Sequence, residues 1–209
     1  MTEFSCPACG APVPFRSKLS VFGVCPFCSQ MLVRRDIDVE AIGKMAMLPE
    51  DSSPLQVGTS GKFEGRQFTL LGRLRQEWAD GNWNEWFAIF DDGSQGWLGE
   101  AQGFLMMSFD KTSGTKIPAS GSLNPGQKIQ IGEIYFEIED IKPVVCAGSQ
   151  GELPFTGQQG RKSISVDLTG PGKTFACLDY SSDGTHAYIG KYVDFSELAL
   201  QNLRQIDGW

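Results

Sequence analysis

Residues 67–90 read QFTLLGRLRQEWADGNWNEWFAIF, and this stretch decides the fold of most of the chain. Apolar and polar residues alternate well enough along 67–78 to predict one long strand, with a bulge or bend at Gly72. The pair Asp80-Gly81 is a hairpin turn signal. Residues 83–90 then return as a second strand, so the stretch predicts a long antiparallel hairpin.

Further strands follow this hairpin toward the C-terminus. We expect them at residues 96–100, 104–109, 128–131, 133–141, 144–147, 163–168, 174–180 and 187–193. Turn residues separate them, and the chain holds 25 glycines among its 209 residues. Many short strands with glycine-rich turns predict a mainly β protein whose body is an antiparallel β-barrel or is β-sandwich-like.

Two parts of this body resemble each other. A series of short motifs that begins at Gly65-Arg66 and ends at Leu98-Gly99 recurs from Gly160-Arg161 to Ile189-Gly190. Duplication of a β-meander would produce this echo, and so would the general similarity of strand-turn-strand patterns. The echo therefore leaves open whether the body consists of two similar β-meander halves.

Ahead of the body lies the strongest chemical signal, two C-x-x-C pairs with 15 residues between them. The four thiols belong to Cys6, Cys9, Cys25 and Cys28. This spacing predicts one structural Zn²⁺ in a four-cysteine site, which leaves no open position for a reacting water. Iron in a rubredoxin-like site is the rival metal. Disulfides or a redox dithiol are the other alternative, although no thioredoxin-like pattern surrounds the cysteines.

The cysteines also divide the chain. Residues 1–36 are expected to form a small zinc ribbon, whose core is too small to fold without metal. Residues 37–54 are expected to be a linker, with a short helix or an extended arm before a Pro- and Ser-rich break. Residues 55–209 form the β-rich domain. Cys146 and Cys177 are expected to be free buried thiols within it.

The net charge of the chain disfavours some classes of binding partner. The net charge is −7, of which the ribbon contributes +2 through Arg16, Lys18, Arg34 and Arg35, so the remainder carries −9. An acidic body repels phosphate backbones, which makes a nucleic-acid-binding ribbon a less favoured interpretation. The sequence has neither a signal peptide pattern nor an apolar run of about 20 residues. Together with the paired thiols, this predicts a cytoplasmic protein.

One acidic, aromatic group in the body is a candidate ligand or partner surface. Its members are Trp83, Glu85, Trp86, Trp97 and Glu100. In one interpretation the tryptophans pack in the core, and Glu85 accepts a hydrogen bond from an indole N–H. In the other, the group lines a groove for a polyamine or another cation, through cation–π and carboxylate contacts. A glycosidase-like carboxylate pair is least favoured.

Catalysis is not expected. The chain has a single histidine, His186, which follows a turn, and no nucleophile lies in a recognisable setting. An uncharacterised hydrolase therefore ranks last among the possible functions.

Several of these stretches resemble the DUF4178 family of bacterial proteins. They are Gly65 to Arg73, Trp83-Asn84-Glu85-Trp86 with Gly96-Trp97-Leu98-Gly99-Glu100, Gly151 to Pro154 and Tyr188 to Val193. The similarity covers roughly residues 55–205, and many members are similar in carrying a four-cysteine ribbon ahead of the domain. The resemblance implies no catalytic residues. Genes of the family tend to lie beside those for membrane-stress proteins and polyamine-synthesis enzymes, which implies an accessory role.

The combined expectation is a zinc-binding, non-enzymatic adaptor whose β-domain binds a partner protein, in a membrane-associated complex or a polyamine-linked system. The alternative is a small-ligand module that binds a polyamine or other cation in its Trp-rich acidic region. The oligomeric state is left open by the sequence.

Overall fold

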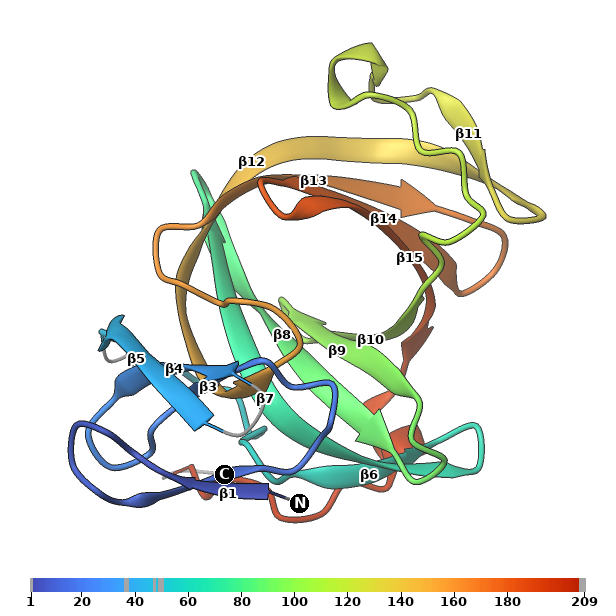
Figure 1. Ribbon diagram of the computed structural model, residues 1–209. Coiled ribbons are helices and arrows are strands. Elements are labelled where there is room, and N and C mark those ends of the chain that lie inside the picture. The colour runs from blue at the N-terminus through green and yellow to red at the C-terminus, as the bar shows by residue number, and fades with distance from the viewer. Residues whose placement is uncertain (1, 36–37, 47, 49–50, 207–209) are drawn as a thin grey trace.

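The protein is mainly β, in agreement with the sequence prediction, and its body is an antiparallel barrel. The computed structural model describes residues 2–35, 38–46, 48 and 51–206. Eight strands form the barrel: β7 (Arg66–Trp78), β8 (Gly81–Phe90), β9 (Gln95–Ala101), β10 (Phe104–Asp110), β12 (Ile134–Leu153), β13 (Lys162–Thr169), β14 (Thr174–Ser181) and β15 (Gly184–Val193). Figure 1 looks into the ring that these strands make.

The ring consists of two meanders that join at both ends. Strands β7 to β10 pair in sequence order, and so do β12 to β15. The ring closes because β10 pairs with β15 and β12 pairs with β7, both antiparallel. A short strand precedes each meander, β6 (Ser60–Phe63) before β7 and β11 (Lys128–Ile131) before β12. The two halves therefore have the same order of strands.

The short motifs that recur in the two halves of the sequence do not lie on corresponding strands of the two meanders. Phe87 lies on β8, the second strand of its meander, whereas Phe175 lies on β14, the third strand of the other. The echo is thus displaced by one strand from the structural correspondence of the halves. It reflects the repeated alternation of strand and glycine turn.

Closure of the ring requires two glycines where β7 and β12 approach each other. Gly72 pairs directly with Gly151. A Cβ on Gly72 would lie 1.9 Å from the Glu152 carbonyl oxygen, and Gly151 has a φ of +67°. The pairing of β7 with β8 shifts between Leu70 and Gly72, so the bulge predicted at Gly72 is present. Only glycine permits this close approach.

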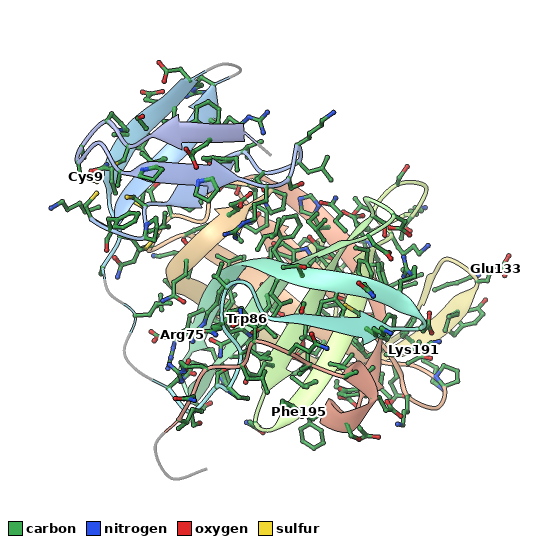
Figure 2. All side chains as sticks on the ribbon, turned by 90° about the horizontal axis from the view of Figure 1, so that it is seen from below. Cys9, Arg75, Trp86, Glu133, Lys191 and Phe195 are labelled. Carbon is green, nitrogen blue, oxygen red and sulfur yellow. The ribbon has the colours of Figure 1, made fainter. Side chains whose placement is uncertain are left out.

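The four-cysteine region forms a ribbon that is larger than the sequence predicted. Its strands are β1 (Thr2–Ser5), β2 (Pro12–Phe15), β3 (Phe22–Val24), β4 (Gln30–Arg35) and β5 (Asp38–Lys44). Strand β5 lies in the predicted linker and pairs with β4, so residues 38–44 are an extended arm that completes the ribbon. The expected boundary residues 36–37 and the breaker residues 49–50 lie outside the described part of the chain. Figure 2 shows the ribbon beside the barrel, with Cys9 at one end of it.

The ribbon is joined to the barrel by backbone and side-chain bonds. Glu152 and Leu153, at the end of β12, pair with Gly23 and Phe22 of β3. The strand expected at residues 144–147 is therefore longer than predicted, because it is part of β12, which continues to Leu153. Buried Glu152 accepts hydrogen bonds on Oε2 from the backbone amides of Arg16 at 2.7 Å and Ser17 at 3.3 Å.

Replacing Glu152 with alanine is expected to loosen the ribbon from the barrel. The change leaves two amides without their acceptor, which costs about 1–3 kcal/mol for a buried donor. Amide hydrogen exchange at residues 12–24 should accelerate while exchange in β13 and β14 stays unchanged. Gln150→Ala, on the same strand but exposed, is the control; equal protection in both variants would contradict the tether.

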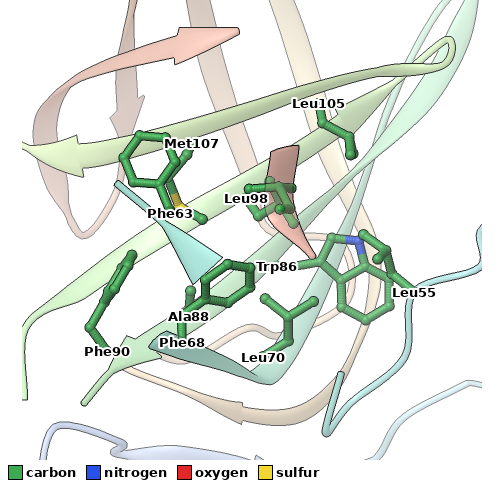
Figure 3. Packing of buried hydrophobic residues seen from close by; sticks show 11 residues of the cluster. Leu55, Phe63, Phe68, Leu70, Trp86, Ala88, Phe90, Leu98, Leu105 and Met107 are labelled. Atoms are coloured by element: carbon green, nitrogen blue, oxygen red, sulfur yellow. The ribbon is translucent and has the colours of Figure 1, made fainter. Parts of the chain in front are cut away.

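Two of the apolar clusters of the barrel lie on its outer face. Leu70, Trp86 and Leu98 pack there against Phe63 of β6 and Leu198 of the 3₁₀ helix η2 (Phe195–Leu198). Figure 3 shows this cluster from close by. A second outer cluster packs against β11 and the segment that holds the 3₁₀ helix η1 (Ser120–Ser122); its barrel residues include Ile138, Val166, Leu168 and Leu178. Each half thus covers its apolar outer face with its own short strand.

Candidate functional site

The four cysteines of the ribbon lie together and can hold a metal ion. Their sulfur atoms all lie within 4.8 Å of one another. The Cys6 and Cys28 sulfurs are 3.7 Å apart, and those of Cys9 and Cys25 are 3.8 Å apart. Four sulfurs at about 2.3 Å from a tetrahedral metal ion are separated by about 3.8 Å. The arrangement therefore fits a tetrahedral metal centre.

Two matching turns build this centre. In the first, the Gly10 amide donates to the Cys6 carbonyl at 2.8 Å, and in the second the Ser29 amide donates to the Cys25 carbonyl at 3.0 Å. The Gln30 amide lowers the pKa of the Cys28 thiol, but burial and the three neighbouring sulfurs outweigh it and raise that pKa to about 12. The four sulfurs can therefore all be thiolates only when a cation lies among them.

The inner face of the barrel is the second candidate site. Because directly paired residues of antiparallel strands point to the same side of a sheet, the register identifies the inward side chains. Opposite Glu85 lies Leu74 on β7, and Asp179 on β14 lies opposite Ser165 and His186. The inward residues of β13 to β15 are largely polar: Ser163, Ser165, Asp167, Cys177, Asp179, Ser181, His186 and Tyr188.

The inner face has an apolar part as well. Phe87 and Trp97 pack at 5.3 Å between ring centroids, and Trp97 packs on Phe155 at 5.7 Å. These residues belong to a cluster with Leu74, which continues into the ribbon through Phe22. The barrel interior is therefore aromatic on the β7 to β9 side and acidic on the β13 to β15 side.

Glu85 connects the two sides. Trp83 Nε1 donates to Glu85 Oε1 at 2.8 Å, and Gln76 Nε2 donates to Oε2 at 3.5 Å. Burial, together with the charge of Asp179, raises the pKa of Glu85 to about 7, although the hydrogen bond from Trp83 opposes the shift. Strands β8 and β14 lie four positions apart around the ring of eight. The influence of Asp179 on Glu85 therefore acts across the barrel interior.

Other inward groups belong to the same electrostatic cluster. Burial raises the pKa of Cys177 well above its usual value, with contributions from Asp167 and Glu85. Burial also raises the pKa of Tyr188, with contributions from Asp110 and Glu85. Glu85, Cys177 and Tyr188 nevertheless keep part of their surface accessible to solvent. Since these side chains point inward, water reaches the acidic side of the barrel interior.

Two basic side chains face these carboxylates. Arg161, just before β13, donates from Nε to Asp183 at 2.8 Å and lies 3.5 Å from Asp179, with its guanidinium 5.1 Å from the Phe155 ring. Lys142 of β12 pairs with Asp167 at 2.8 Å and with Asp140 at 3.0 Å.

The five residues of the predicted surface lie on opposite faces of the barrel wall. Trp83, Glu85 and Trp97 point inward, whereas Trp86 and Glu100 point outward. Trp86 is fully buried in the outer core, and its indole N–H donates to Glu100 Oε2 at 3.1 Å. The same oxygen accepts from Ser53 at 2.7 Å and Asn84 at 2.9 Å. The sequence group therefore divides into an inner part and a structural outer part.

Beside the outer part lies an arginine cluster around Asp51. Its carboxylate accepts from Arg73, from Arg75 Nη1 at 3.0 Å and from Arg204 Nη2 at 3.2 Å. Arg73 also donates to Asn84 at 2.7 Å. This cluster fastens the segment before β6 and the C-terminal segment to the barrel wall.

Several inward residues were not predicted as site residues, notably Asp167, Asp179, Tyr188 and Lys142. Each lies on a different stretch of sequence, and only the ring brings them together. Cys146 and Cys177 are free thiols, as predicted, but only Cys146 is fully buried. His186 is partly exposed, and its Nδ1 lies 3.8 Å from Asp110.

Among the described residues, no helix has the length and apolar character needed to cross a membrane.

Comparisons with known proteins identify the family. No curated protein and no solved structure matches this chain. A family described as a domain of unknown function, DUF4178, matches residues 56–195, which include every strand of the barrel. The chain therefore belongs to the DUF4178 family.

Proposed function

We propose that the protein is a non-enzymatic binding module whose barrel interior receives a small organic cation. The observation that carries this proposal is the inward placement of Glu85 and Asp179 on opposite sides of the ring, next to Trp83 and Trp97. Carboxylates attract an ammonium group, and indole faces stabilise it by about 0.5–2 kcal/mol each.

Spermidine is the probe for this function. Calorimetry should detect its binding to the wild-type protein, and Glu85→Gln should weaken that binding about tenfold, since hydrogen bonds to charged groups are worth about 1.5–3 kcal/mol. Glu133→Gln, at an exposed turn position labelled in Figure 2, is the matched control. Absence of heat and of a thermal shift with the wild-type protein would reject the proposal.

The same titration should depend on pH. The pKa of Glu85 is raised to about 7, so its carboxyl group gains charge as the pH rises from 6 to 8, while spermidine remains a cation. Binding should therefore strengthen over this interval in the wild type and stay nearly constant in Glu85→Gln. Weakening of wild-type binding toward pH 8 would contradict the role of Glu85.

For the ribbon, we propose a structural zinc ion held by Cys6, Cys9, Cys25 and Cys28. Thiolate ligands suit zinc and iron alike, and elemental analysis of the purified protein decides between them. A reducing compartment keeps the thiols available for metal, which favours the cytoplasm.

A partner-protein adaptor is the second candidate function. The ribbon exposes three large apolar side chains, Leu19, Val21 and Phe27, with exposed fractions of 46%, 40% and 69%. Apolar side chains exposed on one small module favour a protein contact. Crosslinking in the native host should then recover a partner that Phe27→Ser loses, and recovery of none would count against the adaptor. A nucleic-acid ribbon ranks below both, and a flat gel-shift titration at low salt would exclude it.

A further inference from the structure

Lys142 lies in a cage of aromatic and acidic side chains on the inner face. Its Nζ is 2.8 Å from Asp167 Oδ2 and 3.0 Å from Asp140 Oδ2. The same nitrogen lies 5.2 Å from the Trp78 ring centroid and 5.8 Å from that of Trp83. The two indoles pack against each other at 5.2 Å. An ammonium group is thus held by two carboxylates and two ring faces.

We propose that Trp78, Trp83, Asp140 and Asp167 form a binding site for primary alkylammonium groups, and that Lys142 occupies it as an internal ligand that a soluble amine displaces. This inference rests on the proposed function, because it assigns the ligand class and the competitor for the same barrel interior.

The composition of the cage supports recognition of an ammonium group over a purely structural ion pair. A lysine in a structural pair needs only carboxylates, whereas indole faces within about 6 Å add an attraction specific to cations. The Lys142 side chain is itself a butylammonium group, so the site accepts that shape. Its stem is flexible and joined at one end. The cage can therefore release Lys142 without a change in the β12 backbone.

Trp83 links this cage to Glu85. Its ring face lies toward Lys142, while its indole N–H donates to Glu85 at 2.8 Å. A diamine that displaces Lys142 would place one ammonium in the cage and its second near the Glu85 carboxylate. A ligand with two or more primary or secondary amines therefore fits the interior better than a monoamine.

While Lys142 occupies the cage, a soluble amine cannot bind there. The apparent affinity for the soluble amine is therefore its intrinsic affinity multiplied by the fraction of time that Lys142 is out of the cage. If Lys142 leaves the cage about one tenth of the time, its removal should strengthen amine binding about tenfold. Lys142→Met keeps the length of the stem and removes the ammonium group, so it isolates this effect. Lys128→Met is the matched control, because Lys128 is exposed and pairs with the exposed Glu137.

The experiment titrates n-butylamine and spermidine into the wild type and both variants, followed by calorimetry and tryptophan fluorescence. Tenfold tighter binding to Lys142→Met, with Lys128→Met like the wild type, supports the inference. Equal or weaker binding to Lys142→Met overturns it, while spermidine binding to the wild type leaves the proposed function standing. Binding of n-butylamine to Lys142→Met, with no binding of either amine to the wild type, supports the cage and rejects the proposed function. No binding to any form rejects both. Lys142→Gln repeats the test should Lys142→Met not fold.

Discussion

Replacing Cys6 and Cys9 with serine is expected to release the metal and unfold the ribbon while the barrel stays folded. The ribbon core is a small cluster around Phe4, Phe15 and Leu32, too small to fold without metal. Structural zinc binding supplies about 10–16 kcal/mol in small metal-dependent domains. Elemental analysis should fall from close to one metal ion per chain to none, and amide exchange should become fast within residues 2–44.

The barrel provides the internal reference for this experiment. Amides in β13 and β14 should keep their protection, because among the described strands of the ribbon only β3 pairs with the ring, and it pairs with β12. Cys177→Ser, a change on the inner face, is the control and should retain the metal. A purified wild-type protein with neither zinc nor iron, whose four N-terminal thiols titrate freely, would show that the metal assignment is wrong.

Asp51→Asn is expected to lower the free energy of unfolding by about 3–5 kcal/mol, the usual cost of removing one partner from a buried ion pair. Arg73 and Arg75 would remain buried, with relative exposures of 4% and 8%, and would lose their shared carboxylate. Urea denaturation measures the change. Asp92→Asn breaks the exposed pair with Arg66 and should cost less than about 1 kcal/mol. Equal effects of the two changes would contradict the structural role of Asp51.

The contribution of Asp51 should also depend on pH. Burial raises the pKa of Asp51, but the charge of Arg73, the Ser53 amide and the charge of Arg204 outweigh it and lower that pKa below its usual value. Its stabilisation is therefore complete above the pKa of the unfolded chain, about 3.9, and is lost as the pH falls through the lower folded value. The stability difference between wild type and Asp51→Asn should shrink in acid below about pH 4.

The strands of the body were largely predictable because their signals are local. Alternation along 67–78 and the turn at Asp80-Gly81 gave β7 and β8 nearly at their observed bounds, and β11 agrees at both ends. Closure of the ring was not predictable in this way. It depends on the contact of Gly72 with Gly151, and these residues lie far apart in sequence. The choice between barrel and sandwich therefore required the structure.

Strands with few local signals were missed. Residues 60–63 contain two polar residues and a glycine, yet they form β6 because Phe63 covers the outer core. Residues 38–44 form β5 because β4 offers an edge for pairing. In both cases tertiary contacts override a weak propensity for strand.

The two candidate sites differ in the same respect. The metal centre was predictable because each C-x-x-C pair builds its turn locally. The inner site was only half predictable. Strand periodicity places Trp83 and Glu85 on one face and Trp86 on the other, and this could have separated them from sequence alone. Their partners Asp167 and Asp179 belong to strands on the far side of the ring, which no local pattern indicates.

The outward placement of two apolar clusters has an evolutionary consequence. Two large apolar clusters of the barrel lie beneath β6 and β11, and Asp167, Cys177 and Tyr188 belong to neither of them. If the interior binds a cation as proposed, substitutions at Asp167, Cys177 or Tyr188 are expected to alter ligand preference with little loss of stability. Such a division lets specificity diverge among members of a family while the scaffold is retained.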